Sequence, residues 1–252
     1  MSAFLAPIHT WLFNKIKLAQ DLEKDIVNLH IDKFKESAIK IQKEANDIYG
    51  QYIEEKPLED LIDVNNIHGW LQDRIKEVES RSAYIITKYY DMYDEESRDL
   101  TESAYISQAI KCAQNENNKS DSPENAYISL NNYILSGMPC DRANSVTEKN
   151  EDYIIYEQNG CIHRKNYENG QGNLEYLYEL RDLWVKTFME SLNTKYLYEK
   201  EKLDDKTINK IIIGKAITMS DISIPLNPRF LFIDFTVIYI IHSSYIIFFL
   251  LL

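Results

Sequence analysis

The sequence predicts a mainly α protein, a helical bundle of four to six helices with a small antiparallel β-hairpin inserted before the last long helix. Glycine and proline are scarce, with 7 and 6 among 252 residues, which favours long helices over a fold rich in turns. Apolar residues recur at spacings of three and four through the first 90 residues. The period changes between residues 144 and 165, where short apolar runs surround a turn signal.

Three apolar series each mark one face of a helix in the N-terminal part of the chain. They run through residues 5–30, 27–52 and 61–89. The first series gives way to the second near residues 26–31, which leaves two interpretations open: one long helix that changes its packing partner, or a break. Because three long amphipathic segments bury their apolar faces most simply against one another, they favour a bundle.

The remaining elements are shorter. The sequence predicts an acidic turn at residues 94–99, a helix at 100–113, a polar loop at 114–125 and a short helix at 126–135. Residues 153–156 and 161–163 resemble strands, and Asn159-Gly160 between them is a strong hairpin signal. Residues 144–148 could supply another strand, and 174–198 return to a helical pattern.

Composition restricts the partners and the compartment. The 28 Lys and Arg residues against 40 Asp and Glu residues give a net charge of −12, which argues against nucleic acid and anionic membrane surfaces as partners. Three cysteines at wide spacing predict free thiols in a reducing compartment. The N-terminus lacks the basic residues of a secretory signal, so we expect a cytoplasmic protein.

The chain divides into a helical domain (residues 1–215, with the hairpin near 144–165), a linker (216–229) and a hydrophobic tail (230–252). The tail is long enough to cross a bilayer, which needs about 20 apolar residues. Two interpretations remain open for it: a transmembrane anchor that attaches the protein to a membrane, or an out-of-frame extension, because charged residues almost vanish after residue 216.

Two histidines form the first candidate metal site. His9 and His68 each lie within an apolar series and share the pattern Ile-His-x-Trp-Leu, at residues 8–12 and 67–71. Imidazoles on facing helices of a bundle commonly hold a metal or a haem, and Glu23 and His30 could extend this set. The alternative is a pair of core histidines that hydrogen-bond a carbonyl or a tyrosine. Trp11 is predicted to pack at the edge of the core.

Cys140, Cys161 and His163 form the second candidate site. Residues two apart in a strand point to the same face, so Cys161 and His163 could meet one ligand together, with Cys140 approaching from a tight turn. Two thiolates and an imidazole suit zinc or iron. Cys161 and His163 could instead form a thiolate-imidazole pair for nucleophilic catalysis, and the alternative to both is inert, buried thiols.

Four short segments carry a resemblance. They are residues 1–16 (MSAFLAPIHTWLFNKI), 66–71 (NIHGWL), 137–141 (GMPCD) and 161–163 (CIH). Together they resemble the signatures of a family of uncharacterised conserved proteins of anaerobic low-GC bacteria. The resemblance covers residues 1–215, implies a cytosolic bacterial protein and draws attention to the four motifs, without implying an activity.

The leading functional hypothesis is a cytoplasmic protein that binds a transition metal (zinc or iron) or a small ligand between the helical core and the hairpin. His9, His68, Cys140, Cys161 and His163 would be the ligands. The alternative is a non-catalytic helical interaction protein, held at a membrane by residues 230–252. A third hypothesis is a thiol-dependent enzyme, and the sequence leaves open whether the protein is an enzyme.

Overall fold

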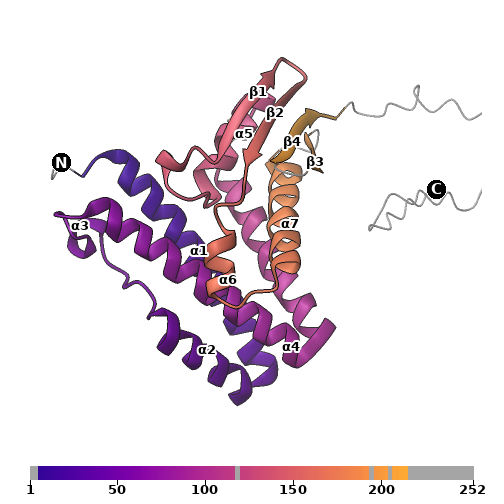
Figure 1. Ribbon diagram of the computed structural model, residues 1–252. Helices are drawn as coiled ribbons and strands as arrows, with labels where there is room; N and C mark the ends of the chain where they lie inside the picture. The colour runs from indigo at the N-terminus through magenta and orange to yellow at the C-terminus, as the bar shows by residue number, and fades with distance from the viewer. Residues whose placement is uncertain (1–4, 117–119, 193–195, 204–205, 215–252) are drawn as a thin grey trace, which may run out of the picture. The chain divides into compact units, whose positions relative to one another are not determined.

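Helices form most of the chain, which confirms the predicted mainly α class (Figure 1). The computed structural model describes residues 5–116, 120–192, 196–203 and 206–214. These residues contain seven α-helices and one four-stranded antiparallel sheet. The helices are α1 (Pro7–Phe34), α2 (Glu36–Tyr49), α3 (Leu58–Leu61), α4 (Ile67–Asn115), α5 (Pro123–Tyr133), α6 (Arg164–Asn169) and α7 (Leu174–Leu192).

A break separates α1 from α2, the second of the two interpretations that the apolar series left open. It lies at Lys35, later than residues 26–31, where φ is 55° and ψ is −125°. Pro7 begins α1 at the position where a missing backbone N–H costs nothing. At the break the Lys35 amide still donates to the carbonyl of Ile31, which closes the last turn of α1.

The long helix α4 replaces three predicted elements. The acidic turn expected at residues 94–99 is present only as a kink at Asp94, where φ is 48° and ψ is −134° and two helical segments meet. Beyond this kink the chain is helical to Asn115, so the expected turn was too long. The Asn66 side chain caps the start of α4 by accepting a hydrogen bond from the Gly69 amide, at 3.2 Å. Acidic residues in a run thus signalled a solvated helix face.

The sheet has the strand order β1-β2-β4-β3. Its strands are β1 (Asn144–Lys149), β2 (Tyr153–Asn159), β3 (Tyr196–Lys202) and β4 (Lys206–Ile213). The hairpin near residues 144–165 is present as β1 and β2, but its turn lies at residues 150–152, where the Asn150 side chain accepts from the amides of Asp152 and Tyr153. The sheet packs on α5 and α7 through a core that includes Ile154, Trp184 and Ile211.

Two predictions about this region were wrong. Residues 161–163 are not a strand, since β2 ends at Asn159 and α6 begins at Arg164. The last long helix ends at Leu192 instead of continuing to Tyr198, and Tyr196 begins β3. In both places a run of a few residues fitted the helical and the extended period equally well.

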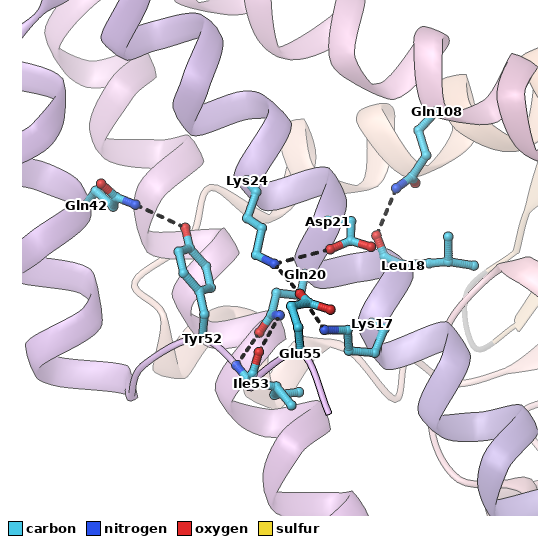
Figure 2. A network of polar contacts seen from close by, with 10 residues as sticks. All are labelled: Lys17, Leu18, Gln20, Asp21, Lys24, Gln42, Tyr52, Ile53, Glu55 and Gln108. Atoms are coloured by element: carbon cyan, nitrogen blue, oxygen red, sulfur yellow. Dashed lines mark hydrogen bonds and ion pairs between the residues drawn. The ribbon is translucent and has the colours of Figure 1, made fainter. Parts of the chain in front are cut away.

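A polar network fastens the segment after α2 to α1 (Figure 2). Gln20 exchanges two hydrogen bonds with the backbone of Ile53, donating to its carbonyl at 3.2 Å and accepting from its amide at 2.6 Å. The Glu55 carboxylate lies 2.7 Å from the amine of Lys17 and 2.8 Å from that of Lys24. On the far side of α1, Gln108 donates to the carbonyl of Leu18 at 2.8 Å, which ties α4 to α1.

A buried ion pair joins α1 and α4. The side chains of Glu23 and Arg81 are both 0% exposed, and Nε of Arg81 donates to Oε1 of Glu23 at 2.7 Å. Nη1 of Arg81 also donates to the carbonyls of Gly50 and Gln51, at 3.0 and 3.3 Å. Oε2 of Glu23 accepts from the hydroxyl of Ser82 at 2.7 Å. One guanidinium therefore connects α1, α4 and the segment that follows α2.

The predicted linker and the predicted hydrophobic tail both lie outside the described residues. Among the helices that the structure describes, none is both long and apolar enough to traverse a bilayer.

Candidate functional site

His9 and His68 are in contact, as their matching motifs suggested. Nε2 of His9 lies 3.3 Å from Nε2 of His68, and the two rings meet edge to face. The amide of Ala6 donates to Nδ1 of His9 at 3.0 Å, so neutral His9 carries its proton on Nε2 and donates it to His68. Burial and the neighbouring His68 lower the pKa of His9. In this arrangement Nε2 of His9 is engaged as a donor and is not an open metal ligand.

The other residues of the predicted metal site lie in separate surroundings. Cys140 is exposed in a short 3-10 helix (Pro139–Asp141), and the thiol of Cys161 contacts the hydroxyl of Tyr178 on α7 at 2.5 Å. His163 is 1% exposed and bonds to Glu79 of α4. The expectation that Cys161 and His163 share a strand face was wrong, because neither residue is in a strand.

The predicted metal ligands do not come together in one cluster in the described structure. Within residues 5–116, 120–192, 196–203 and 206–214, no three or more His, Cys, Asp or Glu side chains are grouped so that they could hold a metal ion. Glu23 and His30, which could have extended the histidine pair, are engaged elsewhere: Glu23 with Arg81, and His30 with Ser97 at 2.9 Å. Trp11 packs at the edge of a core cluster, as predicted.

Glu79 and His163 form a buried dyad. Nδ1 of His163 lies 2.6 Å from Oε1 of Glu79, and the second carboxylate oxygen accepts from the side-chain amide of Asn166 at 2.7 Å. Nε2 of His163 is buried and has no hydrogen-bond partner in the described part of the chain. The ring of Tyr167 stacks on the imidazole, at 5.7 Å between centroids. The dyad connects α4 to the residues at the start of α6.

Glu79 and Tyr167 also line a pocket whose wall comes mainly from α1, α4 and α7, with α4 packed against both of the other helices. The pocket has a volume of about 100 Å³. Its wall is mainly apolar, with side chains from α1, α4 and α7 that include Leu18, Leu22, Ile26, Val78, Ile86 and Leu177. Four charged side chains interrupt this wall, namely Lys15, Glu23, Glu79 and Arg181.

The two acidic groups of the pocket are neutralised or hydrogen-bonded, and the two basic groups are not paired with acids. Glu23 pairs with Arg81, and Glu79 bonds to His163. Lys15 is 3% exposed, and no ion pair joins it or Arg181 to a carboxylate within the described residues. Arg181 donates to the hydroxyl of Ser136 at 2.8 Å. The pocket therefore presents two cations without an anionic partner there.

Lys15 has an unusual environment for an amine. Its Nζ lies 3.5 Å from the centre of the Trp11 ring, one turn earlier on α1. Burial, together with the charge of the nearby Arg181 guanidinium, lowers the pKa of Lys15 to about 8. Near neutral pH a substantial fraction of this amine is therefore unprotonated, which is not the case for an ordinary lysine.

The comparisons with known proteins do not place the chain in a family. No protein-family model matches it, and no curated protein matches it significantly. The resemblance suggested by the four short motifs therefore stays a prediction.

Sequence reasoning missed Lys15, Glu79 and Arg181, although a signal was present. Each stands at a position where the helical spacing calls for an apolar side chain: Lys15 in the series 12, 15, 19, 22, Glu79 in 75, 79, 82, 86 and Arg181 in 177, 181, 184, 188. A charged residue within an apolar face is either paired or functional, since burying an isolated charge is costly.

His30 gives the fold a measurable pH dependence. Its Nδ1 lies 2.8 Å from the carbonyl of Ile26, its ring stacks on Tyr89, and burial lowers its pKa, with Lys33 acting in the same direction. Below pH 6.5 the unfolded state therefore binds more protons than the folded state, so the free energy of unfolding should fall as the pH is lowered from 7 to 5. Denaturant titrations should show a shallower fall for His30→Gln, and equal slopes would contradict this assignment.

Proposed function

We propose that the protein binds a small organic anion, a carboxylate with a short apolar body, in the pocket between α1, α4 and α7. The observation that carries the proposal is the buried amine of Lys15, which lines the pocket beside Arg181 while no described carboxylate pairs with either side chain. The proposal keeps the small-ligand part of the sequence-based hypothesis and assigns binding to Lys15 and Arg181.

Energetics support an anion as the missing partner. Lysine is almost never fully buried unless it is paired, because removal of an ammonium from water costs several kcal/mol. In this pocket a second cation, Arg181, raises the cost, as the lowered pKa of Lys15 reflects. A carboxylate between Lys15 and Arg181 would offset both the cost of burying the ammonium and the repulsion between the two cations. It could also accept two hydrogen bonds from the planar guanidinium of Arg181.

The size of the pocket limits the ligand. A cavity of about 150 Å³ holds benzene, so the pocket volume of about 100 Å³ suits a molecule of about six non-hydrogen atoms at most. The aliphatic wall formed by residues such as Leu18, Ile86 and Leu177 favours a hydrocarbon body of a few carbons over a hydrated inorganic ion.

The test compares butyrate with its uncharged analogue butyramide. Butyrate should raise the unfolding temperature of the full-length protein and give a saturable calorimetric signal, because it binds the folded state only. Butyramide has the same shape without the charge and should bind far more weakly. Arg181→Gln should weaken butyrate binding by about ten- to a hundredfold, the usual effect of losing a charge-assisted hydrogen bond.

The matched control is Arg164→Gln. Arg164 is an exposed arginine on α6 that pairs with Glu168, outside the pocket, so this variant should bind butyrate as the wild type does. The proposal is wrong if butyrate and butyramide act alike, or if the two arginine variants lose binding equally.

A further inference from the structure

We propose that Lys15 is a nucleophile that forms an imine with a small oxo acid, a molecule that carries a carbonyl group and a carboxylate, held in the pocket beside Arg181. This inference rests on the proposed function and gives its ligand a chemical class. The juxtaposition that carries it is a buried amine without an acidic partner in the described structure, a guanidinium on the facing helix and an apolar wall around both.

The amine of Lys15 differs from neighbouring amines on the same helix. Lys17 and Lys24 both lie within 2.8 Å of the Glu55 carboxylate, and this contact raises the pKa of Lys24 (Figure 2). Lys15 contacts the face of Trp11 and lines the pocket. Two changes that activate a lysine for attack on a carbonyl are removal from water and a nearby positive charge, and both are present here.

The free amine is abundant enough to react near neutral pH. With its pKa lowered to about 8, Lys15 carries on the order of a hundredfold more free amine at pH 7.5 than an ordinary lysine does. The titratable and charged groups that share the pocket wall are Glu23, Glu79, Tyr105, Tyr133, Tyr167 and Arg181. The two carboxylates are engaged by Arg81 and His163, which leaves Arg181 as the charge that acts on the amine.

The reaction balances without an added oxidant or reductant. The nitrogen lone pair of Lys15 attacks the carbonyl carbon, and the C–N bond forms while the carbonyl electron pair moves to oxygen. The resulting carbinolamine then loses the oxygen and two hydrogens as one molecule of water, which leaves the C=N bond. Arg181 binds the carboxylate throughout and thereby orients the carbonyl toward the amine.

Borohydride trapping tests the inference on the full-length protein. Glyoxylate and pyruvate are the probes, and sodium borohydride converts an imine into a stable secondary amine. The protein should gain the mass of one oxo acid less one oxygen atom, and peptide mapping should place the adduct on Lys15. The yield should rise with pH through about 8, following deprotonation of this amine.

Two conservative variants separate a specific reaction from random modification. Lys15→Arg keeps the positive charge but cannot form an imine, so trapping should fall at least about tenfold. Lys24→Arg alters an ion-paired lysine on the same helix and should trap like the wild type. Retention of the adduct in Lys15→Arg, or adducts spread over several lysines, would overturn the inference.

The outcome also distinguishes this inference from the proposed function. If butyrate binds as described above and neither oxo acid is trapped, the pocket binds an anion and the imine is wrong. If butyrate does not bind and no adduct forms, both proposals are wrong. Trapping at Lys15 that is lost in Arg181→Gln supports both.

Discussion

Replacing Arg81 with alanine is expected to lower the free energy of unfolding by about 3 to 5 kcal/mol, the usual effect of breaking a buried ion pair by removing one partner. The change leaves the Glu23 carboxylate buried without its counter-charge and the carbonyls of Gly50 and Gln51 without a donor. Burial raises the pKa of Glu23 even with Arg81 present. A carboxyl group whose pKa is raised in the folded state makes the free energy of unfolding fall as the pH rises. The variant should therefore have a lower free energy of unfolding at pH 8 than at pH 5.

Urea denaturation followed by circular dichroism measures this loss. Arg74→Ala is the matched control on α4, because the Arg74–Glu77 pair is partly exposed and should contribute less than about 1 kcal/mol. The double variant Glu23→Leu/Arg81→Met removes both charges and should recover much of the loss. A loss for Arg81→Ala no larger than that of Arg74→Ala would show that the buried pair does not hold the helices together.

Replacing Lys15 with methionine is expected to raise the free energy of unfolding, in contrast to Arg81→Ala. The ligand-free protein should be stabilised by about 1 to 3 kcal/mol at pH 7. Methionine retains most of the apolar side chain and removes a buried ammonium that is repelled by the Arg181 guanidinium. The contact with Trp11 is lost and reduces the gain. The same substitution should abolish butyrate binding.

The pH dependence identifies the cause of this stabilisation. The pKa of Lys15 falls from 10.5 when unfolded to about 8 when folded, so between these values the unfolded state holds a proton that the folded state has lost. The wild type should therefore gain stability as the pH rises from 8 to 10.5, and Lys15→Met should lack this gain. Denaturant titrations at pH 7 and 10 measure the difference, and a variant less stable than the wild type at pH 7 would contradict the assignment.

The parts of the fold that the sequence predicted are those with long, regular periodicity. The stripes through residues 5–89 correspond to α1, α2 and the first half of α4, and the hairpin region corresponds to β1 and β2. Short elements were less certain, since Tyr196–Lys202 continues a helical spacing from α7 while alternating like a strand. Which period prevails there depends on pairing with β4, a contact that local sequence does not encode.

The candidate site was less predictable than the fold. Searching for His and Cys found the contact between His9 and His68, because the two copies of one motif face each other. It did not find Lys15 and Arg181, which lie 166 positions apart and line the same pocket only because α4 packs against both α1 and α7. Their chemistry comes from burial and from the surrounding charges, and both are properties of tertiary structure.

The strand order has a consequence for the making of this protein in the cell. β4 follows β3 in the chain but lies inside the sheet, between β2 and β3. A ribosome releases the chain from its N-terminus, so α1, α2 and α4 can associate while residues 206–213 are still inside the exit tunnel. Until those residues emerge, the backbone edge of β2 that pairs with β4 has no partner strand. Incorrect pairing of this edge with another chain is therefore a hazard until residues 206–213 have left the ribosome.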